Sequence, residues 1–246
     1  MKALLQVEAL GVRFAGLQAL ADVSLQAHPG EVIGLIGPNG AGKTTFINAV
    51  SGAVPYRGRV TFGGRALRGL KPFQIARLRL ARTYQIVQPF PAMTVLDNVA
   101  AGALFVRAEP SLPRARAWAE AVLERVGLAL EAGRPAAQLT LAQRKRLEVA
   151  KALAARPRML LLDEVNAGLN ASEIAEALTL IRGIAAEGVT VLLVEHLMRV
   201  VSGLCSRVVV LHHGRLIADG APAAVLADPA VIEAYLGARY AERNRA

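Results

Sequence analysis

The sequence has 246 residues, of which 54% are hydrophobic and only 4% aromatic, and its formal net charge at pH 7 is +10. A chain of this length and apolar content can bury a large core, which excludes an intrinsically disordered protein. Its single cysteine, Cys205, excludes an internal disulfide and a metal site built from several cysteines. The excess of positively charged residues favours a polyanionic partner or an anionic membrane surface.

The amino-terminal residues, up to about position 30, have the pattern of short alternating strands. The runs LLQVEAL, VRF and ADVSLQAH are separated by glycine and proline, and GRVTFGGRAL further on predicts another exposed strand and turn. We expect these strands to form a small antiparallel sheet. The first residues also carry Glu8 and Arg13 and lack the apolar block and cleavage site of a signal peptide, so we expect a cytoplasmic location.

The stretch EVIGLIGPNGAGKTTFINAV carries the strongest functional signal of the sequence. A β-branched strand runs into the pattern GxxxxGKT and a helical pattern follows, which is the context that a P-loop requires. The glycines allow consecutive N–H groups to point at phosphate oxygens, and the helix that begins near Lys43 adds its positive end. A glycine turn that only links a strand to a helix is the alternative. The candidate phosphate-binding residues are Gly37, Pro38, Asn39, Gly40, Ala41, Gly42, Lys43, Thr44 and Thr45.

Three side chains of this loop have distinct predicted roles. Lys43 is expected against the β- and γ-phosphates of a nucleotide, and Thr44 is expected to give its hydroxyl to Mg²⁺. Thr45 offers a further phosphate donor.

From about Phe90 to Ala155 the apolar spacing becomes helical, as in VLDNVAAGAL and RARAWAEAVLERVGL. Prolines divide this region into separate helices, which predicts a helical subdomain inserted into an α/β core. We expect Trp118 to pack within this subdomain rather than to bind a ligand.

The stretch QLTLAQRKRLEVAKAL, residues 138–153, has two interpretations that its own residues leave open. Its apolar positions have helical spacing, and Thr140 and Gln143 have the spacing of a capping box. The stretch is either an ordinary capped amphipathic helix or one half of a divided active site.

Two further apolar runs end in polar residues. RPRMLLLDE ends at Asp163, the predicted partner of Mg²⁺, and at Glu164, which could polarise the water that attacks the γ-phosphate. A simple polar end to a strand is the alternative. GVTVLLVEH ends at Glu195 and His196. Because ligands of open α/β sheets bind at the carboxyl ends of parallel strands, His196 is a candidate for the same site.

Taken in order, these motifs resemble the nucleotide-binding subunit of ABC transporters over essentially the whole chain. The resemblance implies ATP and Mg²⁺ as cofactors and ATP hydrolysis as the reaction. It further implies that Phe14 stacks on adenine, that Gln85 helps to hold the metal ion and couples it to a membrane partner, and that His196 contacts the γ-phosphate.

The LSGGQ signature of that family falls at 139–143, where this chain has LTLAQ. The chain keeps a hydroxyl at Thr140 and the glutamine at Gln143, whereas Leu141 and Ala142 replace the two glycines of the signature. In the family this segment contacts the nucleotide bound to the partner chain. The resemblance therefore favours the interpretation that residues 138–153 form one half of a divided active site. Without the two glycines, we expect this half to bind nucleotide more weakly than an LSGGQ segment does.

The implied fold is α/β, a P-loop NTPase core of the ABC ATPase type with an antiparallel β subdomain and an inserted helical subdomain. The whole chain, 1–246, is then a single ABC ATPase domain. Residues 1–89 and 156–220 form the nucleotide-binding core with the β subdomain, 90–155 form the helical subdomain with the signature, and 221–246 form a C-terminal helical tail.

Two details narrow the subfamily. The chain has AGLN at 167–170, where most members of the family have SALD, and its last part includes GRLIADGAPAAVLADPAVIEAYLG. Both segments are similar to those of ATPase subunits of branched-chain amino-acid importers. The resemblance implies a subunit that powers such an importer, with urea, amides or another small solute as the alternative cargo. A soluble ABC ATPase acting on nucleic acid or ribosomes suits the charge, but such proteins usually have coiled coils, zinc-binding cysteines or two cassettes. A P-loop kinase does not explain Gln85 or LTLAQ.

The implied partners are integral-membrane permease subunits, which contact a surface near Gln85, and a second ATPase subunit. A heterodimer is favoured, with a homodimer as the alternative, and a substrate-binding protein acts indirectly. Nucleic acid is not an expected partner. The expected location is the cytoplasmic face of the inner membrane, with peripheral attachment.

Overall fold

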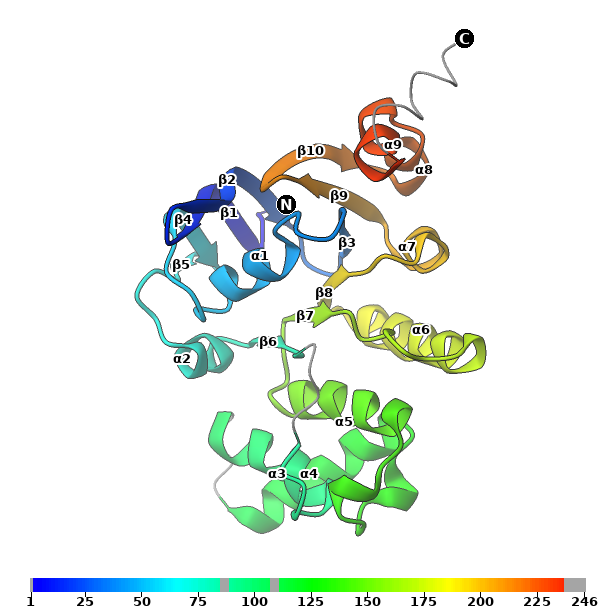
Figure 1. Ribbon diagram of the computed structural model, residues 1–246. Coiled ribbons are helices and arrows are strands. Elements are labelled where there is room, and N and C mark those ends of the chain that lie inside the picture. The colour runs from blue at the N-terminus through cyan, green and yellow to red at the C-terminus, as the bar shows by residue number, and fades with distance from the viewer. Residues whose placement is uncertain (1, 85–88, 107–110, 237–246) are drawn as a thin grey trace. The chain divides into compact units, whose positions relative to one another are not determined.

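The computed structural model describes residues 2–84, 89–106 and 111–236, and Figure 1 gives the order of their helices and strands. The chain divides into two compact units. The first consists of Met1–Pro72 and Thr190–Ala246, and the second of Phe73–Val189.

The first unit contains the predicted antiparallel sheet, with strand order β2-β1-β4-β5. Its strands are β1 (Leu5–Phe14), β2 (Leu17–Ala27), β4 (Arg57–Phe62) and β5 (Arg65–Ala66). The runs LLQVEAL and VRF, expected as separate strands, are both part of β1. The register of β1 against β2 shifts near Ala9 and Gly11, and these local shifts let β1 continue as one strand through both runs.

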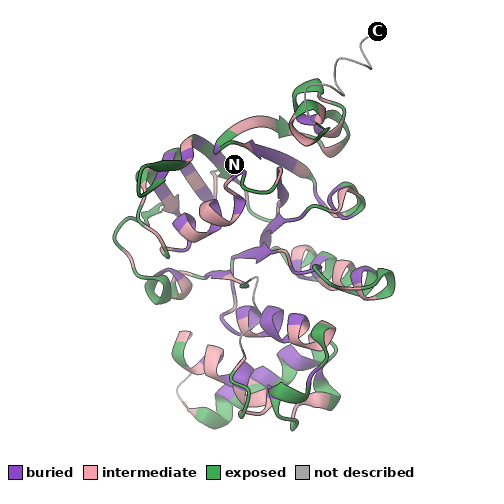
Figure 2. Ribbon diagram, viewed as in Figure 1, coloured by how far each residue is buried: buried purple, intermediate pink, exposed green. Residues whose placement is uncertain are grey.

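Parallel strands form the second layer of the first unit. β3 (Val32–Ile36) pairs with β8 (Thr190–Val194) and with β9 (Arg207–His212), and β10 (Arg215–Gly220) pairs antiparallel with β9. Every residue of β3 and β8 is buried (Figure 2), as expected for apolar strands of a parallel sheet. The helices of this unit include α1 (Lys43–Val50), α7 (Met198–Leu204) and the expected tail helices α8 (Pro222–Leu226) and α9 (Pro229–Leu236).

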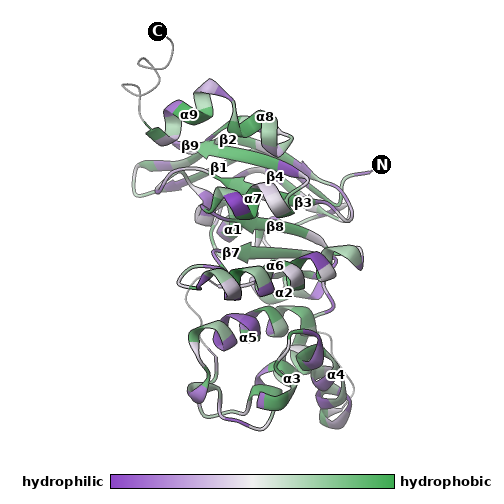
Figure 3. Cartoon of the chain, turned by 90° about the vertical axis from the view of Figure 1, so that its right-hand side faces the viewer, coloured by the Kyte–Doolittle hydropathy of each residue, from purple (hydrophilic) through white to green (hydrophobic). Residues whose placement is uncertain are grey.

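The second unit contains the parallel pair β6 (Leu80–Arg82) and β7 (Met159–Asp163). Its helices include α2 (Pro72–Arg77), α3 (Val95–Val106), α4 (Leu112–Arg125), α5 (Leu141–Ala154) and α6 (Ala171–Ala186), with short 3-10 turns η1 (Ala129–Glu131) and η2 (Ala136–Gln138). Helix α3 packs on α4 and α5, and Figure 3 shows the apolar stretches that these helices carry.

Trp118 of α4 packs against the end of α5 and the residues that follow it. Its Nε1 donates to the carbonyl oxygen of Ala154 at 3.1 Å, and the guanidinium of Arg156 lies 4.2 Å from the centre of its ring. These contacts confirm the packing role predicted for this residue. In the described parts of the chain, no helix combines the length and the apolar character that crossing a membrane requires.

Candidate nucleotide-binding site

The P-loop connects β3 to α1, and its shape depends on glycine. Gly37, Gly40 and Gly42 have φ angles of 148°, 77° and 106°, a region that glycine adopts far more readily than other residues. Space is also limiting, because a Cβ at Gly37 would collide with the carbonyl oxygen of Leu211. The curled backbone expected from the sequence is therefore present.

The side chain of Lys43 is folded over this loop. Its Nζ donates hydrogen bonds to the carbonyl oxygens of Gly37 (2.6 Å) and Pro38 (3.0 Å), and the residue is only 6% exposed. Helix α1 begins after Gly42, which offers no side-chain cap, and its first turn has no acidic residue. The ammonium group and the positive end of the helix thus lie together, which is an arrangement suited to phosphate.

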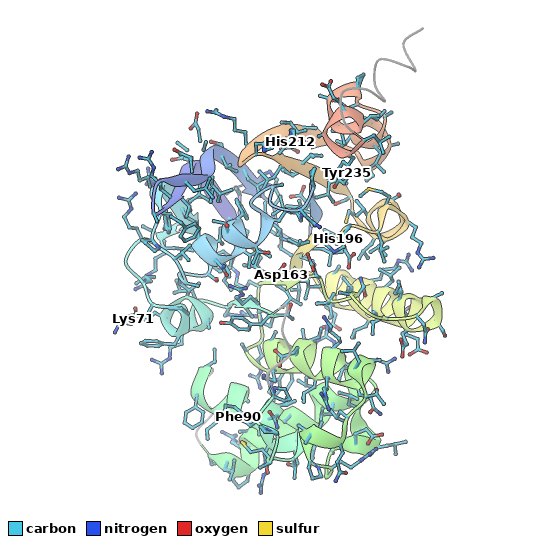
Figure 4. All side chains as sticks on the ribbon, in the orientation of Figure 1. Lys71, Phe90, Asp163, His196, His212 and Tyr235 are labelled. Carbon is cyan, nitrogen blue, oxygen red and sulfur yellow. The ribbon has the colours of Figure 1, made fainter. Side chains whose placement is uncertain are left out.

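Residues far away in the sequence hold the P-loop, and no motif predicts that they belong to the site. The Gly214 N–H, in the turn between β9 and β10, donates to the Ala41 carbonyl oxygen at 3.0 Å, and the Ala21 N–H donates to the Gly214 carbonyl oxygen at 2.8 Å. Burial raises the pKa of the hydroxyl of Tyr235 in α9 (Figure 4), and the nearby Gly37 backbone of the loop lowers it. An isolated glycine and an isolated tyrosine carry no sequence signal that would have revealed these contacts.

Asp163 is the last residue of β7 and is 1% exposed. Its backbone N–H donates to Thr83 Oγ1 at 3.2 Å, and Arg82 Nη2 lies 3.8 Å from its carboxylate. Burial lowers the pKa of Arg82, while Tyr84 and Asp163 counteract this shift. A buried carboxylate at the end of a parallel strand provides the hard oxygen ligands that Mg²⁺ prefers.

Glu164 leaves this strand in an unusual backbone conformation. Its φ angle is 50°, a left-handed value that residues other than glycine rarely adopt. The residue is half-buried, and Lys145 Nζ donates to its carbonyl oxygen at 3.2 Å. Backbone strain of this kind is concentrated at functional sites.

Glu195 and His196 follow β8, the strand beside β3. Leu35 lies opposite Val194, so the P-loop and His196 follow the same edge of the parallel strands. Glu195 is 2% exposed and accepts the His196 N–H at 3.2 Å, whereas His196 itself is exposed.

Burial, together with the Glu195 carboxylate, raises the pKa of Cys205 to about 12, so this thiol is protonated and unreactive.

The segment LTLAQ forms the amino terminus of α5. Gln143 N–H donates to Thr140 Oγ1 at 3.2 Å, and Thr140 N–H donates to Gln143 Oε1 at 3.0 Å, which confirms the predicted capping box. The Gln143 amide also donates to Glu131 Oε1 at 3.1 Å. Leu141 is 49% exposed at the first helical position. The cap does not exclude binding, because the Thr140 hydroxyl keeps its own proton to donate.

Within the first unit, the structure therefore brings His196 to the sheet edge that carries the P-loop. Within the second unit, Asp163 and Glu164 are consecutive, and Lys145 of α5 contacts Glu164. Phe14 ends β1 and is 44% exposed, so its ring is accessible to a ligand. Gln85 lies outside the described residues.

Comparison with known proteins identifies the family. A family model described as ABC transporter matches residues 20–167, which is more than half of the chain. The chain belongs to the ABC transporter family. A second family model, described as branched-chain amino acid ATP-binding cassette transporter, matches residues 215–241 of the cassette.

The relatives of this cassette include two high-affinity branched-chain amino acid transport ATP-binding proteins. LivG of Escherichia coli strain K12 is 40% identical over 253 residues, and BraF of Pseudomonas aeruginosa is 39% identical over 249 residues. Each alignment covers 95% of the cassette and 98% of the relative. Among solved structures, the ADP conformation of an ATP-binding cassette of an ABC transporter has a TM-score of 0.87 and 30% identity, covering 96% of this chain and 100% of that one.

Family membership confirms the ABC ATPase fold and the ATPase activity expected from the sequence. The segment 215–241 that matches the second model begins with β10 and includes α8 and α9. It therefore includes Tyr235, the residue of α9 close to Gly37 of the P-loop.

Proposed function

We propose that this cassette hydrolyses ATP to power a membrane importer for branched-chain amino acids, with the whole chain acting as one ABC ATPase domain. Branched-chain amino acids are proposed as the solute because residues 215–241 match the branched-chain amino acid cassette model. The 40% identity to LivG supports the same solute. Urea, amides or another small solute are the alternative cargo, because the permease and the binding protein of such importers select the solute.

In this proposal the P-loop binds the phosphates of ATP. Backbone N–H groups of the loop 37–42, in which Pro38 has no N–H, and the Lys43 ammonium hold the β- and γ-phosphates, and Thr45 adds a hydroxyl donor. Phe14 stacks on the adenine ring, and His196 contacts the γ-phosphate. The positive φ angles of the loop and the burial of Lys43 support this assignment.

Mg²⁺ fits the residues that are present. In the described part of the chain, no group of three or more His, Cys, Asp and Glu side chains could hold a metal ion alone. Mg²⁺ beside ATP needs few protein ligands, because it keeps waters and phosphate oxygens in its coordination shell. Thr44 and Asp163 would supply protein oxygens, together with Gln85. The bound ion would neutralise phosphate charge, and Glu164 would orient the attacking water.

The charge distribution supports peripheral attachment to an anionic membrane surface. Residues 32–96 contain no Asp or Glu and nine Lys and Arg residues, so nearly all of the net charge of +10 comes from this stretch. Its exposed cations in the first unit are Arg57, Arg59, Arg65, Arg68 and Lys71. Basic segments of this kind are attracted to the negative cytoplasmic leaflet.

Exposed aromatic residues of the second unit support the proposed contact with permease subunits. Phe73, Phe90 and Phe105 are 53%, 56% and 69% exposed, in a chain with only six phenylalanines. Arg77 links two of them, because its guanidinium lies 5.5 Å from the Phe73 ring centre and donates to the Phe105 carbonyl oxygen at 3.5 Å. Phe73 and Phe105 are thus near each other, and neighbouring exposed apolar side chains are typical of protein interfaces.

Replacing Phe105 by serine should weaken association with the permease subunits by on the order of 10-fold, because aromatic anchors dominate interface energies. ATP turnover of the isolated cassette should stay unchanged. Co-purification with the permease and second ATPase subunit measures the effect. Leu130→Ser is the matched control, because Leu130 is 98% exposed on η1 of the same unit. Equal retention of both variants would contradict the proposed surface.

The cassette should be monomeric or weakly associated in the absence of nucleotide. We propose that Thr140 and Gln143 contact ATP bound to the second ATPase subunit, so that nucleotide supplies much of the interface. Light scattering of a mixture of both subunits, before and after addition of ATP, should show dimers only with ATP. A tight dimer that forms without nucleotide would argue against this arrangement.

A further inference from the structure

Helix α5 presents two side chains to the segment that follows β7. Leu141 and Lys145 are four residues apart and therefore lie on the same face of the helix. Lys145 is 8% exposed, and its Nζ donates to the Glu164 carbonyl oxygen at 3.2 Å. Leu141 lies against Gly168, since a Cβ at Gly168 would be 3.0 Å from Leu141 Cδ2. One face of α5 thus contacts both ends of the segment 164–168.

This segment has a tightly turned backbone that needs support. Glu164 has a φ angle of 50° and Gly168 one of 80°. A non-glycine residue in the left-handed region costs about 1–3 kcal/mol and persists only where its surroundings hold it. The Glu164 carbonyl oxygen accepts the N–H of Ala167 at 3.2 Å as well as the Lys145 ammonium. The ammonium therefore helps to hold the peptide group next to the Glu164 side chain.

Packing alone does not explain a lysine at position 145. The residue lines a small, mostly apolar pocket whose wall also includes Val149, Val165 and Leu169. An apolar side chain of similar length would fill this space without the penalty of burying a charge. The ammonium adds a charge-assisted hydrogen bond to the Glu164 carbonyl oxygen, which an apolar side chain could not make.

We propose that Lys145 is a positioning residue for Glu164, through which α5 links the signature segment at its amino terminus to the catalytic carboxylate of the same chain. The inference rests on the proposed role of Glu164 as the group that orients water. When Thr140 and Gln143 engage the nucleotide of the second subunit, any displacement of α5 reaches Glu164 through Lys145. Leu141 and Gly168 form the second contact of this link, which gives the leucine in LTLAQ and the glycine in AGLN a shared structural role.

The test compares Lys145→Met with Lys145→Arg in the full-length cassette. We expect Lys145→Met to lower kcat by about 10- to 100-fold, because small misplacements of a catalytic group have effects of this size. KM and the affinity for ATP should stay within about twofold, since Lys145 does not touch the nucleotide in this proposal. Lys145→Arg should recover most of kcat. Lys151→Met is the matched control, because Lys151 lies on the same helix and pairs with Glu148 at 2.6 Å.

The same substitution in the Glu164→Gln background separates positioning from general structural damage. If Lys145 acts through Glu164, Lys145→Met should cause little further loss there. An equal loss in both backgrounds, or unchanged kcat in a folded Lys145→Met variant, would overturn the proposal. If Lys145→Met does not fold, Lys145→Gln replaces it, with the same expected fall in kcat. Full turnover of Glu164→Gln alone would refute the role of Glu164 and the inference with it, and that outcome is visible without any Lys145 variant.

Discussion

Replacing Glu164 by glutamine should lower the ATP turnover of the cassette by about 10²- to 10⁴-fold, which is the range that a positioned general base contributes. The substitution keeps the size of the side chain and one acceptor oxygen, but it replaces the carboxylate by a neutral amide and so removes the charge that orients the attacking water. ATP binding should remain intact, because Glu164 is not among the phosphate-binding residues. Single-turnover hydrolysis and equilibrium binding of ATP, measured on the same sample, separate the two effects.

The control for this variant is Glu120→Gln, which makes the same chemical change at an exposed position of α4. It should leave turnover and binding unaltered. Unchanged turnover in Glu164→Gln would assign the base to another group, and His196 and Asp163 would be the next residues to test. Loss of ATP binding in Glu164→Gln would instead contradict the proposal that Glu164 acts on the attacking water and not on the bound nucleotide.

Replacing Lys43 by alanine should weaken ATP binding by about 10- to 100-fold, because a hydrogen bond to a charged group contributes about 1.5–3 kcal/mol. Two effects act in the same direction. The variant loses the ammonium that would neutralise the β- and γ-phosphates, and the carbonyl oxygens of Gly37 and Pro38 lose the donor that holds them. Calorimetric titration with ATP measures the affinity, and turnover at saturating ATP shows what activity is left.

Lys71→Ala is the control for the Lys43 variant. Lys71 belongs to the same unit and is exposed (Figure 4), so its loss changes the net charge equally without touching the P-loop. ATP affinity should be nearly the same as for the unmodified chain. If Lys43→Ala bound ATP with full affinity, the assignment of residues 37–45 as the phosphate-binding loop would be wrong.

The local features of this protein could be predicted because neighbouring residues determine them. The P-loop was identified from a strand, three glycines and a lysine within one short stretch, and Lys43 indeed lies over the loop carbonyl oxygens. The capping box of Thr140 and Gln143 depends on a spacing of three residues, and both of its hydrogen bonds form. β3 and β8 were recognised because uninterrupted apolar residues exclude a solvated face.

Only the tertiary structure could decide which distant residues support these local features. Gly214 braces Ala41 across more than 170 positions of sequence. Lys145 stands between two arginines in the sequence, which gives no sign of burial, yet it is buried and bound to the Glu164 carbonyl oxygen. The left-handed backbone at Glu164 was equally hidden, because glutamate has no local preference for it. Hydrogen bonds between remote segments depend on how whole helices and strands pack, and no spacing along the chain encodes that packing.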